Sequence, residues 1–134
     1  MKKEIVPFNF NNFIVSREKI CQFLIETRKI ELDQFRFIGR MDLINAKTMI
    51  ILGFNTRDKI KEIKNLKVTD YVYSQVDIKD RRDVFHVFVK TIQNTQIYIK
   101  IKLRIRKKGV KEIVCLSFHE TDAAELRYPY LSIK

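Results

Sequence analysis

Two histidines and a tyrosine in the second half of the chain could carry out acid–base chemistry. They are His86, Tyr98 and His119, and the sequence contains no other histidine. Imidazole can take or give a proton near neutral pH, and a phenol can donate one. RNA carries its own nucleophile, the 2′-hydroxyl. Its cleavage therefore needs only a base, an acid and cations for the charge that develops on the phosphate. These residue types could supply all three without a metal or another cofactor.

Basic residues alternate with apolar residues from Tyr98 onward, which predicts a strand over residues 96–106 with one buried face. The apolar face would carry Ile97, Ile99, Ile101, Leu103 and Ile105. The other face would carry Tyr98, Lys100, Lys102, Arg104 and Arg106. A row of cations can follow a phosphodiester backbone, and an aromatic ring offers a base a stacking surface.

The next predicted strand, residues 112–119, would bring His119 to Tyr98. Lys108-Gly109 lies between the two strands, and an X-Gly pair suits a two-residue hairpin turn. A ladder that starts with Lys107 opposite Val110 pairs Tyr98 with His119, whereas a slip of one residue would oppose aliphatic and polar side chains. The other expected pairs are Ile99–Phe118, Lys100–Ser117, Ile101–Leu116 and Leu103–Val114.

The preceding strand, residues 84–91, is expected to complete the same polar face. If Phe85, Val87 and Val89 lie on the aliphatic face, His86 and Lys90 point toward Tyr98 and Lys100. The candidate catalytic residues are His119, Tyr98 and His86, and the candidate RNA-binding residues are Arg82, Lys90, Lys100, Lys102 and Arg104. Each has a plainer alternative: a half-buried, hydrogen-bonded histidine, a tyrosine at the rim of the sheet, or a solvated basic strand face.

The elements that must hold these strands lie upstream. Ser16 and Glu18 favour the start of an amphipathic helix over 17–29. A second helix should begin at Asp42 and end at Gly53, and a third should run from Asn55 or Thr56 to about residue 66. Residues 35–38 could form a short strand or an irregular packed segment. Helices followed by a run of strands predict an α+β fold, with N-terminal helices packed on a twisted antiparallel sheet.

Length and charge narrow the function. The 134 residues fit one domain, interpreted as an N-terminal helical extension over about 1–40 and a core over 41–134. Lys and Arg number 27 against 16 acidic residues, and a net charge of +11 favours a polyanionic partner. No membrane partner and a cytoplasmic location are expected, because no apolar run reaches the ~18–20 residues of a bilayer span and no signal peptide is recognisable. Cys21 and Cys115 suggest neither a disulfide framework nor a zinc site.

Five short segments, in this order, carry a family resemblance: Leu52-Gly53-Phe54 with Asp70-Tyr71, Asp83-Val84-Phe85-His86-Val87, Ile97-Tyr98-Ile99-Lys100-Ile101, Cys115-Leu116-Ser117-Phe118-His119-Glu120 and Leu126-Arg127-Tyr128-Pro129-Tyr130. They resemble the MqsR (motility quorum-sensing regulator) toxins of bacterial toxin–antitoxin modules. The resemblance implies a RelE-like ribonuclease fold, metal-independent cleavage of mRNA and a cognate antitoxin protein as partner.

The resemblance also implies roles for single residues. Tyr98 stands at the family's functional tyrosine, and His119 stands where many members have a functional lysine. Arg82 and Tyr73 depart from the pattern, since some members carry an active-site glutamine at the position of Arg82 and a functional lysine at that of Tyr73.

The sequence thus predicts a toxin that acts as an endoribonuclease on mRNA. Two alternatives remain open: a non-catalytic nucleic-acid-binding module, and an adaptor or inhibitor that binds an acidic protein. The predicted pairing of His119 with Tyr98 favours the enzyme, because binding alone needs no pair of titratable groups.

Overall fold

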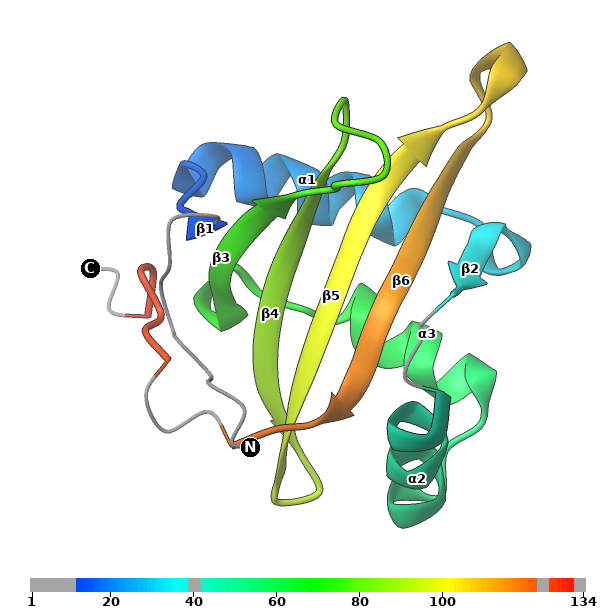
Figure 1. Cartoon of the computed structure of the whole chain (residues 1–134), viewed down its shortest axis with the longest axis vertical. Helices are drawn as coiled ribbons and strands as arrows, with labels where there is room; N and C mark the ends of the chain where they lie inside the picture. Colours follow the sequence, from blue (N-terminus) through cyan, green and yellow to red (C-terminus); the bar gives the residue numbers. More distant parts are fainter. Residues whose placement is uncertain (1–11, 39–41, 123–125, 132–134) are drawn as a thin grey trace.

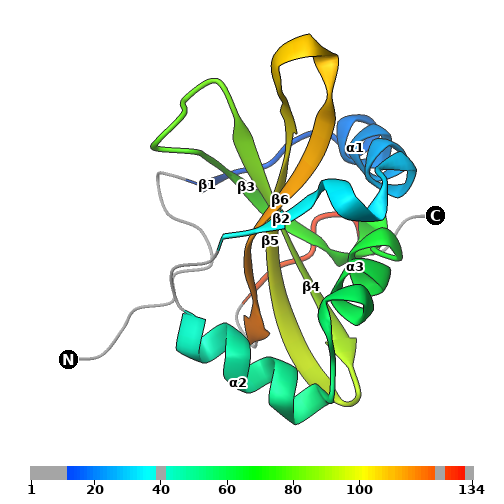
Figure 2. The ribbon, with the colours of Figure 1, turned by 90° about the vertical axis from the view of Figure 1, so that its right-hand side faces the viewer.

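The computed structural model describes residues 12–38, 42–122 and 126–131. In these residues three α-helices and one sheet of six strands form the predicted α+β fold (Figure 1). Helices α1 (Arg17–Lys29) and α3 (Thr56–Lys64) cover one face of the sheet, as the side view in Figure 2 shows. Helix α2 (Asp42–Leu52) lies at the end of the last long strand, where the Thr48 hydroxyl accepts a hydrogen bond from the Glu120 amide. Within the described residues no helix is both long and apolar enough to cross a bilayer.

The strand order places the earliest strands at the two edges of the sheet. The order is β1 (Asn12–Phe13), β3 (Tyr71–Val76), β4 (Val84–Ile92), β5 (Thr95–Ile105), β6 (Lys111–Glu120) and β2 (Phe35–Phe37). Every neighbouring pair is antiparallel except β2 and β6, which are parallel. The part of the chain predicted as a helical extension therefore also supplies both edge strands, while residues 1–11 and 39–40 lie outside the described residues.

The helix boundaries follow from their caps. The Ser16 hydroxyl accepts a hydrogen bond from the Lys19 amide at the start of α1, which confirms the predicted helix over 17–29. Asn55 and Asp58 form a reciprocal capping box at the start of α3. Gly53 ends α2 at a φ of +71°, a conformation that glycine adopts without strain.

The main core lies between the sheet and the helices α1 and α3. Its fully buried members include Ile20 of α1, Ile63 of α3 and Ile99 of the central strand β5. Removing each such side chain from water contributes roughly 1.5–3 kcal/mol to folding. The predicted aliphatic face of β5 is thus confirmed as the helix-covered face for Ile97, Ile99 and Ile101.

The pairing of β5 with β6 is as predicted at Tyr98 but not near the turn. Tyr98 lies opposite His119, and Ile99 lies opposite Phe118. Nearer the turn Ile101 pairs with Cys115 instead of Leu116, and Leu103 pairs with Ile113 instead of Val114. These expectations were wrong because the turn contains three residues, Lys107–Gly109, so Arg106 rather than Lys107 faces Val110.

A β-bulge compensates for the longer turn. Between the pairs Lys100–Ser117 and Ile101–Cys115, the strand β6 holds one extra residue, Leu116. On the side of this bulge that is farther from the turn, the register is the predicted one. The predicted pairs Tyr98–His119 and Lys100–Ser117 are therefore correct.

The predicted orientation of β4 was wrong. Gln93 and Asn94, with φ of 52° and 62°, form a two-residue turn that sets Ile92 opposite Thr95. His86 then lies opposite Ile101, and Lys90 lies opposite Ile97. Both therefore share the helix-covered face. The face that bears Tyr98 and is turned away from α1 and α3, which we call the outer face, instead receives Phe85, Val87 and Val89.

A second apolar cluster on the outer face explains why alternation in β4 misled the prediction. Val72, Tyr73, Val87 and Val89 are buried there against Tyr98, Leu126 and Tyr128. Because β4 is apolar on both faces, its pattern does not identify the helix-covered side. Leu126 and Tyr128 belong to the C-terminal segment, residues 126–131, drawn in red in Figure 1.

The same segment also reaches the main core. The ring of Tyr130 stacks on that of Tyr71 with centroids 5.8 Å apart, and its hydroxyl donates a hydrogen bond of 2.6 Å to the Val15 carbonyl. The Val15 amide in turn donates to the Tyr71 hydroxyl over 3.0 Å. The last described residues are therefore tied to the residues that follow β1.

Candidate functional site

Tyr98 and His119 form a stacked pair on the outer face. They are direct cross-strand partners on β5 and β6, their ring centroids are 5.3 Å apart, and their planes differ by 15°. Both side chains are half-buried. The sequence prediction that these two rings meet on one face, opposite the helices, is confirmed.

A backbone contact fixes the tautomer of His119. Its Nδ1 lies 2.9 Å from the Glu120 carbonyl oxygen. A carbonyl only accepts hydrogen bonds, so in the neutral form of the ring Nδ1 carries the proton and Nε2 carries the lone pair. The neutral imidazole is thereby oriented to act as a base through Nε2.

The hydroxyl of Tyr98 has a neighbour that sequence reasoning did not place in the site. The Tyr73 hydroxyl of β3 lies 3.3 Å from it. Burial, together with the nearby Tyr73, raises the pKa of Tyr98 well above its ordinary value. The Tyr98 phenol therefore stays protonated at neutral pH and is a hydrogen-bond donor. The resemblance noted Tyr73 only as a departure from a functional lysine, and its contact with Tyr98 could not be predicted because it depends on the β3–β4 pairing.

Lys100 follows Tyr98 on the same face of β5 and lines a hollow of about 720 Å³. Its Nζ lies 5.3 Å from the ring centroid of Phe85. The pKa of Lys100 is lowered by burial, and the nearby Asp77 only partly offsets this effect. Phe13 and Gln75 also line this hollow, so it presents a cation, an amide and aromatic surface together.

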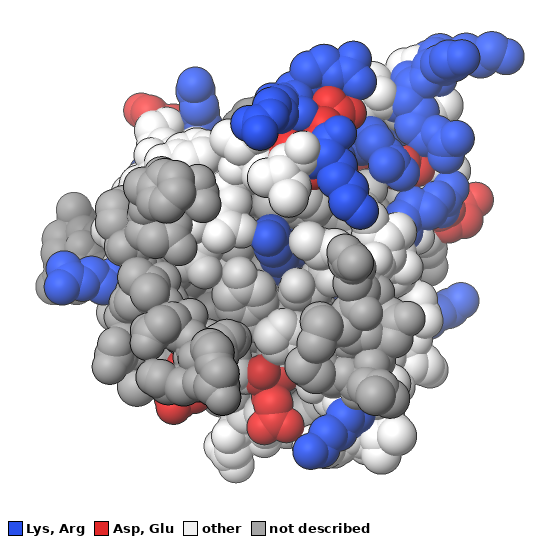
Figure 3. All heavy atoms as spheres, viewed as in Figure 1, with Lys and Arg blue, Asp and Glu red and all other residues white. Residues whose placement is uncertain are grey.

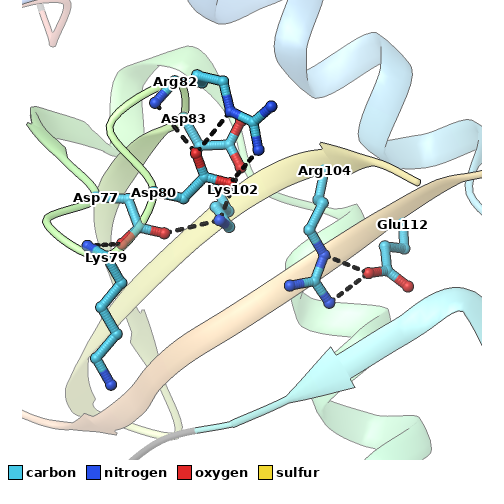
Figure 4. A network of polar contacts seen from close by, with 8 residues as sticks. All are labelled: Asp77, Lys79, Asp80, Arg82, Asp83, Lys102, Arg104 and Glu112. Carbon is cyan, nitrogen blue, oxygen red and sulfur yellow. Dashed lines mark hydrogen bonds and ion pairs between the residues drawn. The ribbon is translucent and has the colours of Figure 1, made fainter. Parts of the chain in front are cut away.

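Lys102 differs from the exposed RNA-binding cation that was predicted. Its Nζ lies 2.7 Å from Asp77 and 2.8 Å from Asp83, and its side chain is only 4% exposed (Figure 4). Its charge is therefore matched by two carboxylates of the β3–β4 loop. We assign Lys102 to holding this loop on β5.

Replacing Lys102 with methionine is expected to lower the free energy of unfolding by about 2 kcal/mol, because two partly buried carboxylates lose their counter-charge. Urea unfolding measures the loss. Lys79→Met removes the same charge from an exposed position in the same loop and should cost far less. Equal losses in the two variants would contradict the assigned role of Lys102.

Two of the predicted arginines, Arg82 and Arg104, lie in the β3–β4 loop and toward the end of β5 (Figure 4). Arg82 lies in the β3–β4 loop with its side chain 88% exposed, and it contacts Asp80 over 2.9 Å. Arg104 on β5 is 37% exposed and bonds the buried Glu112 through Nε and Nη2 (Figure 4). Both can reach a ligand from solvent.

His86 and Lys90 do not share this surface. His86 accepts or donates a hydrogen bond of 2.7 Å with the Ser74 hydroxyl, and its ring meets that of Phe23 of α1 at 4.5 Å. Burial lowers the pKa of His86 to about 4. Lys90 forms an ion pair of 2.8 Å with Glu62 of α3. The expectation that they face Tyr98 was wrong, and the alternative of a hydrogen-bonded, largely buried histidine holds for His86.

No protein-family model matches the chain, and no curated protein matches its sequence. The case for a function therefore rests on the geometry of the outer face. That face brings together Tyr98, His119 and Lys100, with Arg104 and Arg82 farther along it.

Proposed function

We propose that this protein is a metal-independent endoribonuclease that cleaves mRNA, with a RelE-like fold and the role of a toxin in a toxin–antitoxin system. The observation that carries the proposal is the stacked Tyr98–His119 pair on the outer face. It offers a lone-pair nitrogen and a protonated phenol side by side, which are the groups that transesterification of RNA requires.

The reaction follows from the state of each group. Nε2 of His119 takes the proton of the 2′-hydroxyl while its oxygen bonds to phosphorus. The Tyr98 phenol and the Lys100 ammonium stabilise the charge on the phosphoryl oxygens. The bond from phosphorus to the 5′-oxygen then breaks, and that oxygen receives the proton from the His119 imidazolium. The products are a 2′,3′-cyclic phosphate and a 5′-hydroxyl.

The surroundings of the pair suit a single RNA strand. An aromatic surface is worth about 1–3 kcal/mol per stacked base, and the exposed Phe13 lies in the hollow beside Lys100. The net charge of +11 supports a polyanionic substrate. A cognate antitoxin would silence the enzyme by covering this basic surface.

Purified protein should cleave an end-labelled RNA in the presence of EDTA and should leave the matched all-2′-deoxy oligonucleotide intact, because the 2′-hydroxyl is the nucleophile. Gel analysis gives the cut sites, and mass spectrometry should find cyclic phosphate ends. Loss of cleavage in EDTA, or equal cleavage of the deoxy strand, would exclude the proposed chemistry.

A second candidate is a nucleic-acid-binding module that does not cleave. It is favoured by the half-buried Tyr98 hydroxyl, which lies 3.3 Å from that of Tyr73 and is flanked by the C-terminal segment. Tight RNA binding by the same preparation, without any cut product, would support this candidate over the enzyme.

A further inference from the structure

Three arginines converge on one buried carboxylate at the basic end of the outer face. Arg36 of β2, Arg104 of β5 and Arg106, which follows β5, all contact Glu112 of β6. The side chain of Glu112 is 0% exposed, whereas those of the arginines are 39%, 37% and 55% exposed in the same order. The carboxylate thus lies beneath a layer of guanidinium groups that reach solvent.

The carboxylate of Glu112 neither neutralises all the charge of these arginines nor uses all their hydrogen-bond donors. Three positive charges against one negative charge leave a surplus of two. Arg104 holds Oε2 at 2.5 Å, but Oε1 lies 3.4 Å from Arg36 and 3.5 Å from Arg106. Within the described part of the chain Oε1 receives no hydrogen bond. A carboxylate also offers far fewer acceptor positions than three guanidinium groups offer donors. The cluster is oriented by Glu112 and still has donors for another anion.

The arginines border a second hollow of the outer face. Its volume is about 980 Å³, and besides the three arginines it is lined by two more cations, two carboxylates and an amide, namely Arg82, Lys107, Asp80, Asp83 and Gln34. Asp80 and Arg104 line this hollow and also the one at Lys100, so the two adjoin. Figure 3 shows Lys and Arg side chains gathered over the end of the sheet where the β3–β4 loop and the turn between β5 and β6 lie.

The strand β5 sets the separation between this cluster and the stacked pair. Tyr98 and Arg104 point to the same face and are six residues apart, which corresponds to roughly 20 Å along a strand. Lys100 lies between them on that face, whereas the charge of Lys102 is matched by Asp77 and Asp83. A ligand that uses both ends must therefore carry negative charges at intervals along an extended chain.

We propose that Arg36, Arg104 and Arg106, organised by Glu112, form a clamp for the phosphates of single-stranded RNA at a distance from the bond that is cut. This inference rests on the proposed RNA substrate and extends it to a strand of several nucleotides. Guanidinium groups bind phosphate through paired hydrogen bonds, which suits a site that fixes the backbone without reading the sequence. The clamp sets the direction in which RNA leaves the Tyr98–His119 pair.

The clamp is tested by binding, with an RNA that cannot be cut. Labelled 2′-O-methyl oligonucleotides lack the nucleophile, so their affinity does not depend on catalysis. Arg36→Gln and Arg106→Gln should each weaken binding of a strand that spans both hollows by about tenfold and reduce the slope of log affinity against log salt by about 0.7. Arg28→Gln, which removes the same charge from an exposed position on α1, should stay close to wild type. A dinucleotide, too short to reach the clamp, should bind the wild type and the clamp variants equally.

Each result decides between distinct claims. Equal binding by the clamp variants and Arg28→Gln would overturn the clamp while leaving RNA cleavage open. A specific loss in the clamp variants, in a protein that never cuts natural RNA, would support the clamp and reject only the ribonuclease. Tighter binding of polyglutamate than of the oligonucleotide would overturn the clamp by assigning the surface to an acidic protein.

Discussion

Replacing His119 with alanine should slow cleavage of RNA by about 10²–10⁴-fold, the usual contribution of a proton-transfer group. The variant removes the only base that the proposed mechanism uses. It should fold normally, because the ring is half-buried and its described contacts are the stack on Tyr98 and a bond to its own strand. Initial rates on labelled RNA measure the effect, and arrest of growth on expression should disappear with it.

Two variants show whether the loss comes from proton transfer. Ser117→Ala changes a neighbour on β6 that cannot titrate near neutral pH, and it should cleave at close to the wild-type rate. Tyr98→Phe keeps the stacked ring but removes the hydroxyl, so it should slow cleavage while RNA affinity changes little. Wild-type cleavage by His119→Ala, with its fold intact, would show that the base lies elsewhere.

The stability of the protein should fall steeply in mild acid because of His86. Burial lowers the pKa of His86 from 6.5 to about 4, so the folded protein takes up this proton at a lower pH than the unfolded chain does. The stability that the uncharged, buried His86 contributes is fully present above its unfolded pKa of 6.5, and it is lost as the pH falls toward 4. A shift of this size corresponds to about 3 kcal/mol. Protonation would also change the hydrogen bonds that join the hydroxyls of Tyr71 and Ser74 to Nδ1 of His86.

Urea unfolding between pH 7 and pH 4 measures this loss. His86→Gln cannot titrate, so it should be less stable than the wild type at pH 7 but should lose less stability on acidification. Ser117→Ala retains His86 and should keep the wild-type dependence on pH. An identical slope in wild type and His86→Gln would rule out His86 as the source.

Local signals in the sequence were sufficient for most of the elements. Ser16 begins α1, Gly53 ends α2, and the alternation of Ile and basic residues in 97–105 marks both faces of β5. These features depend on residues that are only a few positions apart in the sequence, because helix capping and hydrophobic periodicity are local effects. The Tyr98–His119 pairing was predicted from a two-residue turn, and it is correct because the bulge at Leu116 offsets the three-residue turn that the structure has.

The parts that failed depend on turns and on contacts that are distant in sequence. Gln93-Asn94 forms a tight turn with two positive φ values. Because the prediction did not include this turn, it placed His86 and Lys90 on the face of Tyr98, whereas they lie on the helix-covered face. The ion pairs of Lys102 join strand β5 to a loop about twenty residues earlier, so periodicity could not reveal that its charge is matched. The arginines around Glu112 come together only because β2 pairs with β6, a parallel contact between segments far apart in the chain.

The contacts of Tyr130 have a consequence for the handling of the protein. Its ring packs on Tyr71 and its hydroxyl holds the Val15 carbonyl, close to the two-residue strand that shields β3. Removal of the segment that carries Tyr130 would weaken the hold on that short strand and make the backbone of β3 more open to pairing with another chain. Shortened preparations should therefore aggregate before they lose their secondary structure.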